Sequence, residues 1–185
     1  AARGLAGHLF ERPWQDFGAN RTEALALARE HSDSEYLWML DADDIVEGNP
    51  DLAGLTADAY LVRVGPGVEY WRPQIFRRAL PWRYVGVLHE YPACDVAAPR
   101  IDRIEGTYQI LSRRLGSRSR DPRKYERDAA ILQAALAREP DNARHAFYLA
   151  QSWFDAGQFD RALEAYRDRE RMGGWAEEVF YARYR

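Results

Sequence analysis

The sequence predicts an α/β domain followed by an all-α domain, and three observations support this fold class. Up to about residue 112, short apolar runs alternate with Gly/Pro turns, which is typical of strands. From about residue 122 onward, apolar residues recur at helical spacing. Between these regions, residues 112–124 hold six basic residues and one acidic residue, which indicates a linker or mobile loop. We therefore expect one domain over residues 1–115 and a helical domain over residues 121–185.

The start of the first domain has the pattern of a strand, a helix and a second strand. A short strand is expected at His8–Phe10, and a helix is expected from about Ala19 to His31. The run Tyr36–Leu40 is continuously apolar, as in a central strand that is covered on both faces. This succession predicts a parallel α/β arrangement.

The rest of the first domain is expected to be antiparallel or mixed. A short helix is predicted to begin near Pro50. Apolar runs bounded by turn residues predict further strands at Ala59–Val64, Glu69–Phe76, Tyr84–Leu88 and Thr107–Leu111.

The helical domain contains an internal repeat with a period of 34 residues. At this period Tyr125 falls on Phe159, and Leu132 falls on Tyr166. The clearest unit, Ala143–Arg171, resembles a tetratricopeptide repeat. Because isolated repeats cannot bury their apolar faces, we expect the helices to pack on the first domain or on another chain, including a homo-oligomer.

Charge and composition exclude several classes of protein. The 185 residues include 26 Lys plus Arg and 29 Asp plus Glu, so a net charge of -3 argues against binding nucleic acid by bulk electrostatics. The single cysteine, Cys94, cannot form an internal disulfide, which fits a reducing compartment. No apolar run approaches the ~20 residues of a membrane span. We expect a cytoplasmic protein.

Carboxylates gather directly after the run Tyr36–Leu40. From Asp41 to Asp58 there are six acidic residues and no basic one. Asp41 and Asp43 are two residues apart, so in extended backbone their side chains project to the same side. Such a pair can hold Mg²⁺ or Mn²⁺, which are hard cations that prefer oxygen ligands. The alternative is an acidic turn that caps a following helix.

Three ordered segments carry a further signal. They are residues 13–25, residues 37–44 with the sequence Leu-Trp-Met-Leu-Asp-Ala-Asp-Asp, and residues 84–90 with the sequence Tyr-Val-Gly-Val-Leu-His-Glu. Together they resemble the family 2 glycosyltransferases of the GT-A fold, especially the bacterial subgroup that carries tetratricopeptide repeats. The resemblance implies a GT-A-like mixed sheet with flanking helices. It further implies metal-dependent transfer of a sugar with inversion of configuration. The donor would be a nucleotide-diphosphate sugar, with a UDP-sugar as the preferred candidate, and the acceptor a peptide, a protein or a small molecule.

The resemblance also assigns roles to particular residues. Asp41 and Asp43 match the D-x-D motif that binds metal and diphosphate, with Asp43 preferred as the direct ligand. His89 matches a position that completes metal coordination, and a hydrogen-bonded histidine at a strand end is the alternative. Glu90 and Asp44 are both candidates for the carboxylate that deprotonates the acceptor, and the sequence does not decide between them.

Further candidates line the donor and acceptor sites. Asn20 and Arg21 open the first helix, where they would touch the donor's sugar or diphosphate; helix capping and an ordinary surface charge are the alternatives. Trp71, Arg72 and Trp82 are expected to line the acceptor groove, because aromatic faces stack on sugars and Arg binds phosphates. Each of these three is alternatively a core or edge residue.

The family pattern begins before this sequence does. A GT-A domain opens with βα units that hold the nucleotide base, so we expect the chain to lack that base-binding half. Two other functions stay open. One is a protein-interaction module, in which the repeats bind a peptide and the α/β domain is a scaffold. The other is a nucleotidyltransferase, which would need a Gly-rich basic loop near its start.

Overall fold

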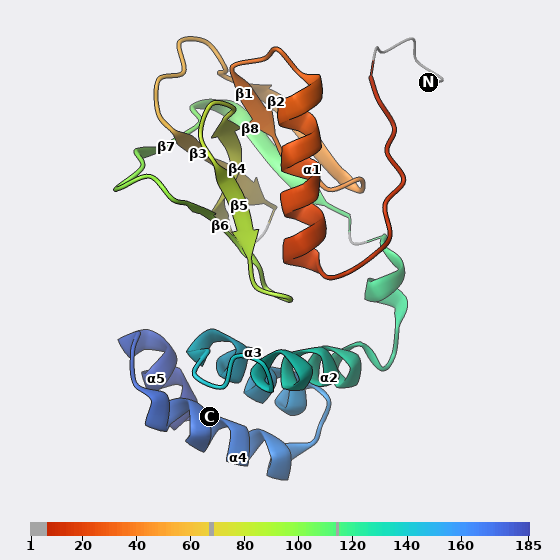
Figure 1. Ribbon diagram of the computed structural model, residues 1–185, viewed down its shortest axis with the longest axis vertical. Coiled ribbons are helices and arrows are strands. Elements are labelled where there is room, and N and C mark those ends of the chain that lie inside the picture. Colours follow the sequence, from red (N-terminus) through yellow and green to blue (C-terminus); the bar gives the residue numbers. More distant parts are fainter. Residues whose placement is uncertain (1–6, 67–68, 114) are drawn as a thin grey trace. The chain divides into compact units, whose positions relative to one another are not determined.

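The computed structural model describes residues 7–66, 69–113 and 115–185 (Figure 1). These residues divide into two compact units. The first takes in the described residues up to Val85 and from Tyr91 to Leu115. The second contains Gly86–Glu90 and Gly116–Arg185. The short segment Gly86–Glu90 is therefore grouped with the helices, although its neighbours on both sides lie in the first unit.

The first unit is built on a curled, mixed β-sheet. Its strands are β1 (Tyr36–Trp38), β2 (Asp44–Pro50), β3 (Ala59–Gly65), β4 (Tyr70–Arg77), β7 (Ile101–Arg103) and β8 (Gly106–Ser112). The strand order is β1-β4-β3-β8-β2, and β7 also pairs with β3. Pairing of β3 with β7 and β8 is parallel, and the other pairs are antiparallel. A separate hairpin joins β5 (Trp82–Val85) to β6 (Tyr91–Cys94).

Alternation along β3 explains how the sheet forms its main core. Tyr60, Val62 and Val64 are buried on one face of the strand, as the two-residue period of a strand requires. They pack with Ile75 of β4 and Ile110 of β8. This cluster fixes the register of the three central strands, because a slip by one residue would expose it.

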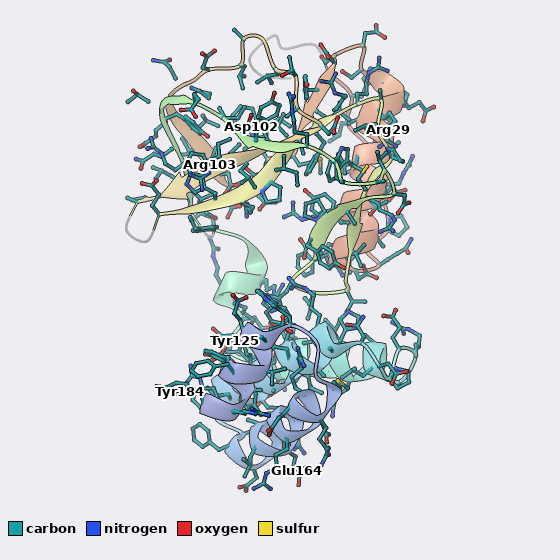
Figure 2. All side chains as sticks on the ribbon, turned by 90° about the vertical axis from the view of Figure 1, so that its left-hand side faces the viewer. Arg29, Asp102, Arg103, Tyr125, Glu164 and Tyr184 are labelled. Carbon is teal, nitrogen blue, oxygen red and sulfur yellow. The ribbon has the colours of Figure 1, made fainter. Side chains whose placement is uncertain are left out.

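Helix α1 (Phe17–His31) supplies a second core on the sheet (Figure 1). Its N-cap is Asp16, whose side chain accepts a hydrogen bond from the Ala19 N–H at 2.8 Å. Leu25, which is fully buried, packs in one cluster with residues of β1 and β4. Arg29, labelled in Figure 2, donates hydrogen bonds to the carbonyl oxygens of Arg78 and Leu80 and ties the helix to the turn before β5.

The second unit is helical. It contains a 3₁₀ turn η1 (Ser117–Arg120), followed by α2 (Lys124–Leu136), α3 (Ala143–Asp155), α4 (Phe159–Met172) and α5 (Ala176–Tyr184). Helix α3 packs against α2 and α4, and α4 packs against α5.

Small and large side chains alternate in the helical core. Ala150 of α3 and Ala162 of α4 let the helices approach closely, and Trp153 and Tyr166 fill the space beside them.

In the part of the chain that the structure describes, none of the helices has the length and apolar character that a membrane span requires.

The structure corrects four expectations for the first unit. The strand expected at Tyr84–Leu88 is β5, which runs from Trp82 to Val85 and ends before Gly86. Residues His8–Phe10 belong to no strand. The run at Tyr36 forms β1, which pairs antiparallel with β4 and not in a parallel sheet. Its apolar character comes from packing on two sides, with Leu37 in the core under α1 and Tyr36 against the main core.

The region near Pro50 is strand and not helix. It belongs to β2, which pairs with β8 from Asp44↔Ser112 to Pro50↔Gly106. Gly48 permits the close approach of the two strands. Its φ is +83°, and a Cβ at this position would lie 2.2 Å from the Thr107 carbonyl oxygen.

Candidate functional site

An acidic turn, residues Asp41–Asp44, joins β1 to β2 in the first unit. The Asp44 N–H donates to the Asp41 carbonyl oxygen at 3.0 Å and closes the turn. Two residues that follow β8 also hold this turn through hydrogen bonds to Asp43. Leu115 N–H donates to the Asp43 carboxylate at 2.7 Å, and Arg113 Nε donates to the Asp43 carbonyl oxygen at 3.2 Å.

Arginine and aspartate side chains alternate in a network on this turn. Arg21 of α1 donates to Asp41 at 2.5 Å. Arg72 of β4 lies 3.9 Å from the other oxygen of Asp41 and donates to Asp44 at 3.1 Å. The side chains of Arg21, Asp41 and Arg72 are about one quarter to one third exposed (24%, 33% and 32%). The network therefore opens to solvent on the side of Asp41.

Asp44 forms the closed end of this network. Its side chain has no exposed area, and one of its carboxylate oxygens binds Arg72. In the described part of the chain, the other oxygen, Oδ1, has no hydrogen-bond partner, and neither has Nε of Arg72. Asp44 thus fixes the orientation of Arg72, and its carboxylate is closed off from solvent.

The oxygen ligands that the acidic turn offers can be compared with the ligand set that a divalent cation requires. Among the described residues, no group of three or more His, Cys, Asp or Glu side chains gathers as a metal-binding cluster. Mg²⁺ in nucleotide sites, however, uses one or two carboxylates and completes its octahedron with phosphate oxygens and water. Asp43 fits this pattern, because a carboxylate that accepts one N–H keeps further lone pairs. Asp41 fits it less well, since Arg21 already binds it.

Asn20 has a structural role in this conformation. Its amide nitrogen donates to the Pro13 carbonyl oxygen at 3.0 Å, and its amide oxygen accepts from the Gln15 N–H at 2.8 Å. The helix begins at Phe17, two residues earlier than expected, so Asn20 and Arg21 lie one turn inside it. The guanidinium of Arg21 also lies over the Tyr84 ring, at 5.6 Å from the ring centroid.

The three acceptor-site candidates lie in different surroundings. Arg72 belongs to the acidic-turn network described above. Trp71 of β4 is half-buried, and Arg103 of β7 (Figure 2) stacks over its ring at 4.7 Å. Trp82 is 4% exposed and packs against Phe76 in the core under α1, so its ring has no surface for stacking on a sugar.

His89 and Glu90 lie in the second unit, in the segment Gly86–Glu90. The His89 ring is parallel to the Tyr148 ring of α3, with centroids 3.8 Å apart and an interplanar angle of 6°. His89 as a residue is exposed, but stacking on Tyr148 removes water from one face of its imidazole; this loss of water, with the nearby charge of Arg118, lowers the pKa of His89 to about 4. His89 is therefore neutral at physiological pH, the form that can bind a metal. Glu90 is half-buried.

Within the first unit, the structure brings together five of the candidates. Gathered on or beside the acidic turn are Asp41, Asp43, Asp44, Arg21 and Arg72. The contacts of Arg113 and Leu115 with Asp43 were missed, because nothing in their sequence signals a partner about 70 residues away. The contact between Tyr148 and His89 was missed for the same reason.

No protein-family model matches the sequence, and no curated protein matches it at a significant level.

Proposed function

We propose that this chain is a metal-dependent, inverting glycosyltransferase with a GT-A-like first unit and tetratricopeptide-type helices in the second. The observation that carries the proposal is the acidic turn. It combines a carboxylate suited to a divalent cation, Asp43, with two guanidinium groups that contact its neighbour Asp41. A cation ligand beside fixed arginines suits a nucleoside diphosphate, whose phosphate oxygens need both.

Each residue of the turn then has a distinct task. Asp43 would hold Mg²⁺ or Mn²⁺, which when bound offsets the negative charge on a leaving diphosphate. Arg21 and Arg72 would bind the phosphate oxygens, with Asp41 and the buried Asp44 holding their guanidinium planes in place.

Glu90 is the better candidate for the general base. A general base must come within hydrogen-bond reach of the acceptor hydroxyl or thiol. Asp44 has no exposed side-chain area and is engaged by Arg72. Glu90 is half-buried, so part of the residue is open to solvent. We therefore assign the proton transfer to Glu90 and a holding role to Asp44.

A groove in the second unit favours a second function, peptide binding by the helices. It lies among α2, α3 and α4, has a volume of about 550 Å³, and is lined by Leu136, Leu149 and Met172 with Asp168 and Arg171. An apolar floor with charged residues beside it suits an extended or helical peptide. A peptide bound there could be the acceptor of the transferase or the partner of an interaction module.

The first test is calorimetric titration of pyrophosphate and of uridine, guanosine and thymidine diphosphates into the chain, with and without Mn²⁺. Pyrophosphate is included because it tests binding of the diphosphate separately from recognition of a base. We expect Mn²⁺-dependent binding that is lost in Asp43→Ala. The matched control is Asp33→Ala, which removes an exposed carboxylate from the loop between α1 and β1.

Two results would count against the proposal. If the folded chain binds neither pyrophosphate nor any of the nucleotides in the presence of Mn²⁺, the acidic turn is not a metal–diphosphate site. If Asp43→Ala binds as tightly as the unaltered chain, Asp43 is not the cation ligand.

A further inference from the structure

The segment Gly86–Glu90 forms a tight loop between strands β5 and β6. Gly86 has a φ of +103°, and a Cβ there would lie 3.3 Å from the Leu88 carbonyl oxygen. Leu88 is 1% exposed and anchors the loop. His89 has a φ of +51°, a left-handed conformation that is costly for a residue with a Cβ. Such a conformation persists only where the surroundings hold it.

Helix α3 supplies those surroundings through two neighbouring side chains. Tyr148 stacks on the His89 ring at 3.8 Å. Arg144 donates two hydrogen bonds to the His89 carbonyl oxygen, from Nη2 at 2.8 Å and from Nε at 3.3 Å. Arg144 and Tyr148 are four residues apart on one helix face, and the guanidinium lies over the Tyr148 ring at 4.9 Å. Both the backbone and the side chain of His89 are thus held by the same pair.

Two further contacts of α3 complete the arrangement. Arg144 Nη1 lies 3.9 Å from Glu178 of α5, so the pair is connected to the last helix as well. His145, which is 2% exposed, lies under the loop, with its Nε2 3.9 Å from where a Cβ on Gly86 would be. The N-cap of α3, Asn142, fixes the start of this helix by accepting from the His145 N–H at 3.0 Å.

We propose that α3 is a mount for the Gly86–Glu90 loop, in which Arg144 and Tyr148 are positioning residues that hold His89, and through its backbone the adjoining Glu90, in one conformation. The functional meaning of the mount rests on the proposed function, in which Glu90 serves proton transfer, and on the resemblance, which gives His89 a part in metal coordination. The helical unit then does more than bind partners. It determines whether two candidate site residues are ordered.

Two measurements on the full chain test the mount directly. The first is the NMR chemical shift of the His89 ring protons, which a parallel tyrosine ring 3.8 Å away displaces upfield. The second is hydrogen exchange of the loop amides. Since a stacked aromatic pair contributes a roughly two- to tenfold change in an equilibrium, Tyr148→Leu should speed loop exchange by about that factor and remove the shift.

Conservative and control variants separate positioning from general destabilisation. Tyr148→Phe keeps the ring and should retain both signals. Arg144→Ala should speed loop exchange, because it removes both bonds to the His89 carbonyl. The controls are Tyr184→Leu (Figure 2) and Arg167→Ala, which change exposed residues of α5 and α4 and should leave the loop unchanged.

The mount is refuted if Tyr148→Leu keeps the ring-proton shift and the slow exchange, or if Tyr184→Leu loosens the loop equally. Mn²⁺-dependent diphosphate binding then separates the two proposals. If Asp43→Ala abolishes this binding and Tyr148→Leu leaves it unchanged, the proposed function stands and the mount has no part in it. If Asp43→Ala leaves it unchanged, the proposed function fails, and the loop measurements alone decide on the mount.

Discussion

The buried ion pair between Arg169 of α4 and Glu178 of α5 gives the sharpest stability prediction. Arg169 is 1% exposed, and its Nη2 lies 2.9 Å from the Glu178 carboxylate. Arg169 also donates from Nη1 to the Gly173 carbonyl oxygen at 2.6 Å, which holds the turn between the two helices. Glu178→Ala removes the partner and leaves a buried, uncompensated guanidinium.

Breaking a buried pair from one side costs about 3–5 kcal/mol of unfolding free energy. For a domain of the size of the second unit, a loss of ~3 kcal/mol lowers Tm by roughly 12–24 °C. The assay is thermal unfolding followed by circular dichroism of the helices. The control, Glu177→Ala, removes the neighbouring exposed carboxylate and should change the unfolding free energy by no more than ~0.5 kcal/mol. A loss below ~1 kcal/mol in Glu178→Ala would refute the reasoning that the pair is desolvated and essential to α5 docking.

Two other changes test the backbone and the pH response. Gly54 has a φ of +62° and open space around it, so Gly54→Ala should lower the unfolding free energy measured in urea by roughly 1–2 kcal/mol. Gly48→Ala should lower it clearly more, because its Cβ would lie 2.2 Å from backbone of β8. Equal losses in the two variants would contradict the close approach of β2 and β8. Since burial and Arg118 lower the pKa of His89 from 6.5 to about 4, the unfolded state takes up a proton first as pH falls. The stability that depends on a neutral His89 is complete above about pH 6.5 and is lost as the pH falls toward 4. The unfolding free energy of the unaltered chain should therefore decrease over this pH range. That of His89→Asn, which has no imidazole to protonate, should decrease less.

Elements with strong apolar patterns could be predicted from the sequence. The expected strands at Ala59–Val64, Glu69–Phe76 and Thr107–Leu111 correspond closely to β3, β4 and β8. Helix α1 was also expected, and the structure extends it by two residues at its start, where Asp16 is the cap. In each case local periodicity and tertiary packing favour the same structure.

Strand β2 could not be predicted, because its residues carry no strand signal of their own. In the sequence Asp-Ile-Val-Glu-Gly-Asn-Pro only Ile45 and Val46 favour a strand, and Gly and Pro are residue types that usually end one. Its conformation comes from pairing with β8, about 60 residues later. The opposite error at His8–Phe10 has the same origin, since apolar residues there find no strand to pair with.

The residues of the candidate site could be predicted from the sequence, but the contacts between them could not. The D-x-D pattern and the arginines at 21 and 72 are visible in the sequence. That Asp44 is closed off by Arg72 depends on how β2 and β4 lie in the sheet. Its neighbour Asp43 is half-buried and its carboxylate accepts from the Leu115 N–H instead, and no local pattern distinguishes these two adjacent carboxylates.

The bond between Leu115 and Asp43 has a consequence for the order in which the site is made. It joins residues 72 positions apart, and β2 has β8 as its partner along its whole length. A nascent chain that has left the ribosome only as far as residue 100 can form α1 and the β3–β4 pair, but nothing yet holds β2 or the Asp43 carboxylate. Closing so long a loop is among the slower steps of folding. The acidic turn is therefore completed late, after synthesis has passed the end of the sheet, and a chain stopped earlier would carry the D-x-D sequence without its geometry.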